Sequence, residues 1–177
     1  MKKIGKFFVY LLFFIFALIL FMPKSSLYYF AETELKEFGV LISNETLVES
    51  FSTLKVKNLD VSVKGIESVD IVSADFTLLG VYNNISFQNI KLSSIVEAYL
   101  PSKIEDMNIV YSLLHPLSIR AKAIGDFGEV NANFDLLELK LKADLKPSKL
   151  MLRRYRSSLH FFKKSKEGEY IYAKSIQ

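Results

Sequence analysis

An uninterrupted apolar run near the N-terminus constrains this chain more than any other feature. Sixteen consecutive apolar or aromatic residues follow a head that carries three lysines. As a helix the run would be about 24 Å long, against about 30 Å of bilayer hydrocarbon. Because no face of it is polar, it predicts a membrane-directing helix rather than a helix of a soluble core. The side chains expected to span the bilayer are Phe7, Phe8, Leu11, Leu12, Phe14, Ile15, Leu18, Ile19 and Met22.

The residues after this run bear on whether the helix stays attached. A cleaved secretory signal has an apolar core of about 7–15 residues and then a small-residue cleavage site. Here the core is longer, and Pro23-Lys24-Ser25 offers no Ala-x-Ala pattern. We therefore expect an uncleaved signal-anchor over residues 1–24, with a cleaved signal as the alternative. The lysines before the run favour an N-terminus inside and a translocated chain beyond Lys24.

The charge is unevenly distributed along the chain. Residues 31–145 hold ten basic and seventeen acidic side chains, whereas residues 146–177 hold nine basic and two acidic ones. The basic character therefore comes from the two ends, and translocation would separate the chain from nucleic acid, so no nucleic-acid partner is expected. The roughly 150 residues after the anchor suffice for one domain, and the absence of cysteine rules out disulfides and thiolate metal sites.

The segment after the anchor predicts a short juxtamembrane helix. Residues 25–39 place Leu27, Ala31, Leu35 and Phe38 on one helical face, and Gly39 suits the end of the helix.

From Val40 onward, apolar residues alternate with polar ones, which is typical of strands with one buried face. The alternation slips near Asn58, near Val72 and before Ile90, which indicates bulges or bends, and Asn83-Asn84 is expected to form a hairpin turn. Residues 40–177 thus predict a mainly β domain. We expect a curved antiparallel sheet of seven or eight strands, as an open half-barrel or a sandwich-like fold.

The C-terminal part predicts one amphipathic helix near residues 148–164 that covers the sheet. Leu152, Tyr155, Leu159 and Phe162 would form its apolar face. Its basic side could contact anionic lipid, dock onto an acidic protein surface, or simply be solvated. The side chains proposed for lipid or partner contact are Lys149, Arg153, Arg154, Arg156, Lys163 and Lys164.

The sequence holds no pattern typical of catalysis, metal binding or cofactor binding. His115 precedes a proline in an expected turn, and His160 lies beside Phe161, so both are interpreted as structural. The adjacent Glu105 and Asp106 would point to opposite faces of a strand and could not share a proton. We therefore expect a protein that is not an enzyme, with no catalytic residue, metal ligand or cofactor.

Several short stretches resemble the type II secretion system protein N family and, more loosely, AsmA-like envelope proteins. They are Leu27-Tyr28-Tyr29, Glu34-Leu35, Gly39-Val40, Gly125 to Val130, Leu139-Lys140-Leu141 and Leu145-Lys146-Pro147-Ser148. The resemblance implies a single-pass protein of the bacterial inner membrane with a periplasmic β-rich domain. It implies no catalytic residues.

Two classes of function follow. The first is a non-enzymatic subunit that assists protein secretion or envelope assembly through other envelope or secretion proteins. The second is a lipid-binding or lipid-transfer protein with an apolar ligand in a curved-sheet groove. Small inward residues would leave room for a lipid or would reflect tight curvature: Ala74, Ala121, Ala123, Ala132 and Ala143.

Overall fold

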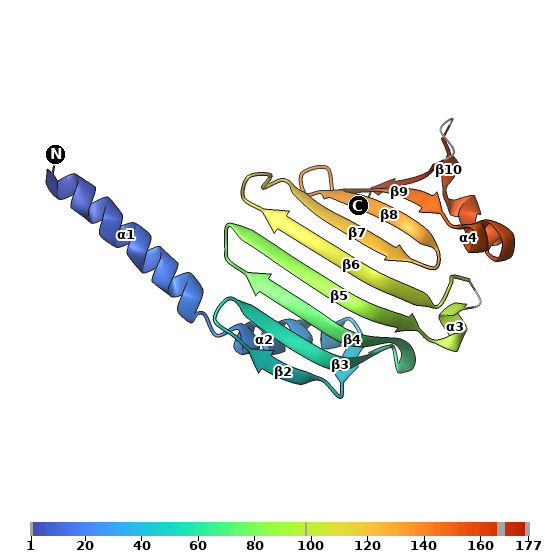
Figure 1. Cartoon of the computed structure of the whole chain (residues 1–177), viewed down its shortest axis with the longest axis horizontal. Helices are drawn as coiled ribbons and strands as arrows, with labels where there is room; N and C mark the ends of the chain where they lie inside the picture. The colour runs from blue at the N-terminus through green and yellow to red at the C-terminus, as the bar shows by residue number, and fades with distance from the viewer. Residues whose placement is uncertain (1, 98, 166–168, 176–177) are drawn as a thin grey trace.

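The computed structural model describes residues 2–97, 99–165 and 169–175. A long N-terminal helix projects from a body built on one antiparallel sheet (Figure 1). The helices are α1 (Lys2–Phe21), α2 (Lys24–Glu37), α3 (Ser94–Glu97), α4 (Lys149–Arg154) and the 3-10 helix η1 (Arg156–Phe161).

The predicted mainly β architecture is confirmed, as an open sheet of eleven strands rather than seven or eight. The strands are β1 (Val40–Ser43), β2 (Thr46–Glu49), β3 (Thr53–Val63), β4 (Ile66–Leu78), β5 (Tyr82–Leu92), β6 (Lys103–Ser112), β7 (Ser118–Gly125), β8 (Gly128–Asp135), β9 (Lys140–Pro147), β10 (Lys163–Lys164) and β11 (Tyr170–Ser175). Their order is β1-β3-β4-β5-β6-β7-β8-β9-β11-β10, and β2 also pairs with β3. Consecutive strands from β3 to β9 are therefore neighbours, as in a meander.

The apolar run forms α1, in which the 19 residues from Lys3 to Phe21 are long and apolar enough to cross a membrane. None of this segment is buried in the body. Eight of the nine side chains predicted to span the bilayer lie in α1, and Met22 follows its last residue. Only Met22 and Pro23 separate α1 from α2, so the body begins directly beyond the apolar helix.

The juxtamembrane helix forms, and the side chains that it buries against the sheet are not those of its predicted apolar face. Lys24, Tyr28 and Glu32 are its buried residues, whereas Leu27, Ala31, Leu35 and Phe38 are exposed. Tyr28 packs with Leu54, Val56, Leu59 and Ala74 in a first core cluster, and its ring meets Phe76 edge-on at 6.0 Å. Tyr28 is buried because its position on α2 faces β3 and β4.

The three slips in the sequence alternation are confirmed, and they lie side by side in the sheet. Asn58 and Asn89 have φ of 56° and 52°, and neither they nor Val72 has a paired partner in the ladders between β3, β4 and β5. A residue in the left-handed region reverses which side chains face the core. Leu54 and Val56 before Asn58 and Leu59 after it are therefore buried on the same face.

Asn83 and Asn84 do not form the predicted hairpin turn; they lie inside β5. The chain turns at Leu79–Val81, where Gly80 has φ +73°, and Asn83 holds this turn with its side-chain amide. Its carbonyl oxygen accepts from the Gly80 N–H, and its amide donates to the Gly80 carbonyl, both at 3.1 Å.

The single C-terminal helix predicted near residues 148–164 is also wrong. Ser148 caps α4 by accepting from the Met151 N–H, the helix ends at Arg154, η1 follows, and Lys163 and Lys164 form β10. Met151, Tyr155 and Leu159 are buried against Leu145 in a second core cluster, whereas Leu152 is 42% exposed. Met151, Tyr155 and Leu159 are spaced four residues apart, so the buried side runs through Met151 and leaves Leu152 on the exposed side.

Candidate functional site

One face of the sheet is apolar from β4 to β9. The strand register places the inward side chains of β4 to β9 in rows that run across the sheet. One row is Phe76, Ile85, Ile109, Ala121, Ala132 and Ala143, and the next is Ala74, Phe87, Met107, Ala123, Val130 and Leu145. All five alanines predicted to face inward belong to these rows.

This apolar face is covered mainly at its two ends. The helix α2 packs on β1, β2 and β3, and α4 packs on β9, which yields the two separate core clusters. Between them most inward side chains of β5 to β8 are half-buried; Ile90 is buried, and Phe87 and Val130 pack against the first and second cluster. Ala121, Ala123 and Ala132 are half-buried, whereas Ala74 and Ala143 are buried. The middle of the sheet therefore presents apolar surface without a helix layer.

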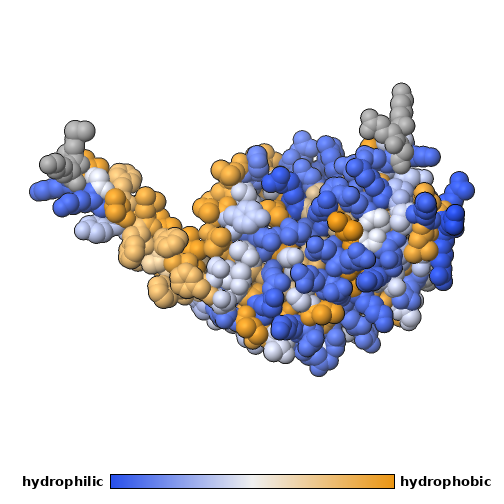
Figure 2. Space-filling view, viewed as in Figure 1, coloured by the Kyte–Doolittle hydropathy of each residue, from blue (hydrophilic) through white to orange (hydrophobic). Residues whose placement is uncertain are grey.

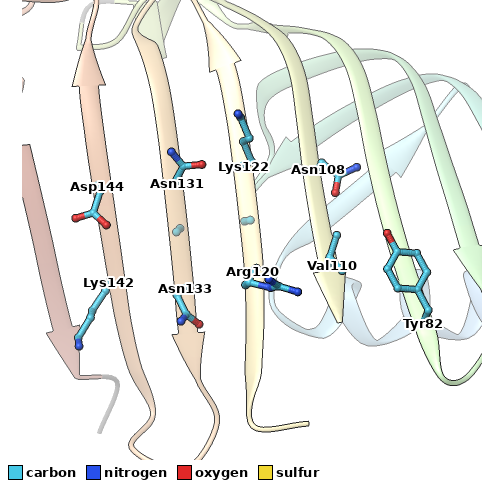
Figure 3. Close-up of a pocket in the computed structure, with 11 residues that line it drawn as sticks. Tyr82, Asn108, Val110, Arg120, Lys122, Asn131, Asn133, Lys142 and Asp144 are labelled. Carbon is cyan, nitrogen blue, oxygen red and sulfur yellow. The ribbon is translucent and has the colours of Figure 1, made fainter. Parts of the chain in front are cut away.

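A hollow of about 610 Å³ lies on the opposite, polar face, and not on the apolar face where a groove was expected. Figure 3 shows its side chains in two rows across β5 to β9. The row nearer the β6–β7 and β8–β9 turns is Lys142, Asn133, Arg120, Val110 and Tyr82, and the other is Asp144, Asn131, Lys122 and Asn108.

The charge of this hollow is positive. Lys122 forms an ion pair of 2.8 Å with Glu129, and its hydrogen bond holds the pKa of that carboxyl below its usual range. Arg120 and Lys142 form no ion pair with any residue of the described ranges. With Asp144 as the remaining acid of the lining, the hollow suits an anionic group such as a phosphate or carboxylate.

The six cations proposed for lipid or partner contact are all exposed, but they do not lie on one helix. Lys149, Arg153 and Arg154 belong to α4, Arg156 begins η1, and Lys163 and Lys164 form β10. Figure 1 places α4 at the opposite end of the sheet from α1. The elements that carry the six cations therefore lie at the end of the sheet away from α1.

The two histidines and the acidic pair occupy separate places. His115 lies in the β6–β7 turn, where its N–H donates to the Ser112 carbonyl. His160 lies in η1, where its ring contacts the Ser157 carbonyl and Phe161, and Glu105 and Asp106 lie in β6. Within residues 2–97, 99–165 and 169–175, no three histidine, aspartate or glutamate side chains gather as metal ligands would.

The sequence interpretation missed Arg120 and Lys142. Each stands between apolar residues of a strand, Ile119 and Ala121 or Leu141 and Ala143, so the alternation already assigned it to the polar face. What was lacking was the register that brings β7 and β9 together around β8. Comparison with protein families, with curated proteins and with solved structures found no match to this chain.

Proposed function

We propose that this protein is a non-enzymatic, membrane-anchored protein of the bacterial envelope that binds the acyl chain of a lipid on its open apolar sheet face. The proposal places α1 in the inner membrane and the sheet in the periplasm. The observation that carries it is the continuous apolar face of β5 to β8, which has no helix layer between the clusters under α2 and α4.

The geometry favours an extended, flexible apolar ligand over a compact one. The apolar rows cross several strands at about 4.8 Å per strand, so the open part between β5 and β8 is about 15 Å wide. Because the side chain of alanine is a single methyl group, an alkyl chain can lie close to the backbone of the sheet there. The basic hollow on the other face is too polar for such a chain.

A matched pair of variants on β8 tests this proposal. Ala132 faces the apolar side and Asn131, its neighbour, faces the polar side. The full chain is purified in mild detergent, and lipids that remain bound are extracted and quantified by mass spectrometry. We expect lipid bound to the wild type and to Asn131→Glu, and at least a tenfold loss in Ala132→Glu.

Circular dichroism of both variants verifies that the sheet persists. If Ala132→Glu unfolds, Ala132→Leu replaces it. The larger apolar side chain fills part of the proposed binding surface on β8 without adding a charge. Wild-type protein that carries no more lipid than the detergent background would contradict the proposal.

The second candidate is a subunit that assists protein secretion or envelope assembly, as the resemblance implies. It is supported by the exposed cations of α4, η1 and β10 at the end of the sheet away from α1. We expect Arg153→Glu with Arg156→Glu to abolish cross-linking to acidic envelope partners in whole cells, while Lys57→Glu, which changes an exposed cation of β3, leaves it intact. Equal cross-linking in all three proteins would argue against this candidate.

A further inference from the structure

Three turns at one end of the sheet carry exposed apolar side chains. They are Leu79–Val81 between β4 and β5, residues 113–117 between β6 and β7, and residues 136–139 between β8 and β9. The β2–β3 turn ends at the same place, because Thr53 at the start of β3 pairs with Thr77 near the end of β4. We call this surface the apolar rim; its exposed members are Phe51, Val81, Leu113, Leu114, Leu117, Leu137 and Leu139.

Backbone hydrogen bonds link the three turns of the apolar rim into one continuous surface. The Leu113 N–H donates to the Val81 carbonyl at 2.9 Å, which joins the first turn to the second. The Leu136 N–H donates to the Leu117 carbonyl at 2.9 Å, which joins the second turn to the third. Leu114 is 86% exposed and Leu137 is 72% exposed, so these two leucines are the most exposed side chains of the apolar rim.

The rim lies beside the end of α1. A Cβ added at Gly80 would lie 3.4 Å from Cδ1 of Ile19, so the side chain of Ile19 lies close to the first turn. Only Met22 and Pro23 separate α1 from α2. Glu49, at the end of β2, accepts hydrogen bonds from the first residues of α2, so the sheet is held close to where α1 ends.

The rim carries almost no charge. Glu138 is the one acidic or basic side chain, apart from His115, in the turns 79–81, 113–117 and 136–139. In Figure 2 apolar side chains gather at the edge of the body next to α1, whereas polar side chains cover most of the visible face. Exposed apolar surface of this extent, rimmed by polar residues, marks a contact with protein or membrane.

We propose that the apolar rim enters the interface of the bilayer that α1 spans, so that the turns contact the membrane and the strands extend away from it. This inference rests on the membrane anchoring in the proposed function, but not on lipid binding by the sheet face. The bilayer is the occupant because α1 and its short connection hold the rim at the membrane surface. Insertion of the leucines removes apolar surface from water without displacing a charged cluster.

The side chains just above the rim match this orientation. Arg120 and Lys142 lie two residues into β7 and β9, which is about 7 Å from the strand ends on the polar face. At that height their unpaired charges meet the phosphates of the lipid head groups. On the other face, Tyr111, Ile119, Phe134 and Leu141 continue the rim into the apolar rows of the sheet.

The chain contains no tryptophan, so single tryptophans report its depth directly. The full chain is reconstituted into phosphatidylethanolamine–phosphatidylglycerol vesicles that contain nitroxide-labelled lipid. Leu114→Trp and Leu137→Trp probe the rim, and Ile95→Trp, in α3 at the other end of the sheet and 59% exposed, is the control. We expect nitroxides near the head groups to quench both rim tryptophans at least threefold more than the control.

Phe13→Trp, in the middle of α1, separates the two proposals. Quenching of Phe13→Trp by a deep nitroxide shows that α1 is inserted. If Phe13→Trp is quenched while Leu114→Trp and Leu137→Trp are quenched no more than Ile95→Trp, the rim proposal is wrong and the anchor stands. If Phe13→Trp is not quenched, the anchoring itself is wrong, and the rim proposal falls with it.

Discussion

Glu49 holds the first turn of α2 through Ser25. One carboxylate oxygen accepts from the Ser25 hydroxyl at 2.5 Å and from its N–H at 3.3 Å, and the other accepts from the Lys24 N–H at 3.0 Å. The residue before α2, Pro23, provides no side-chain cap. A strand residue 24 positions away therefore satisfies the helix start, where free N–H groups attract negative charge.

This relationship predicts a pH-dependent stability. The Ser25 hydroxyl, and then the Lys24 N–H, hold the pKa of Glu49 below its usual value of 4.5. A carboxyl whose pKa is lower in the folded state stabilises the fold above its unfolded pKa and loses this effect as the pH falls. We expect Glu49→Gln to lower the melting temperature at pH 7, with the difference from wild type shrinking below about pH 4.5. A difference that is the same at pH 7 and pH 3 would contradict this.

The second core cluster predicts which residue of α4 stabilises the fold. Met151 is 1% exposed, so Met151→Ala should lower the free energy of unfolding by about 2–5 kcal/mol through the cavity it leaves. Leu152→Ala changes the adjacent, exposed residue and should alter it by less than about 0.5 kcal/mol. Chemical denaturation in detergent, followed by circular dichroism, measures both. The reverse ranking would mean that the expected face, with Leu152, is the buried one.

The left-handed asparagines predict an unusual response to a strand-forming residue. Asn89 lies inside β5 with φ of 52°, which costs a β-branched side chain about 1–2 kcal/mol. We expect Asn89→Val to destabilise the protein by that amount, although valine favours strands. Gln88→Val, at the neighbouring paired position, is the control and should be nearly neutral. If Asn89→Val is as stable as Gln88→Val, the bend is absent in solution.

The hydroxyl of Tyr28 predicts a stabilising substitution. It is buried and has no hydrogen-bond partner in the described part of the chain, and burial raises the pKa of Tyr28 well above its ordinary value. Because an unpaired buried hydroxyl costs free energy, Tyr28→Phe should raise the free energy of unfolding by about 1 kcal/mol. Tyr29→Phe, which changes an exposed ring, should leave it within about 0.5 kcal/mol. Loss of stability in Tyr28→Phe would show that the hydroxyl is paired.

Local pattern in the sequence determined the apolar helix, the class of fold and the places where the strands bend. An apolar run has one favourable environment, and alternation of period two assigns each residue of a strand to a face without knowledge of its neighbours. The slips at Asn58, at Val72 and before Ile90 were readable for the same reason: each is a residue without a ladder partner, left-handed at Asn58 and Asn89, that reverses the assignment within the strand itself.

Tertiary structure decided which helix faces are buried and which residues form sites. Tyr28 and Met151 are core residues because the sheet lies against them, and helical spacing alone favoured other faces. Arg120 and Lys142 come together across β8, and the leucines of three distant turns form one rim, only through strand register. Register follows from the packing and pairing of whole strands, so residues far apart in the chain acquire a shared surface that no single segment encodes.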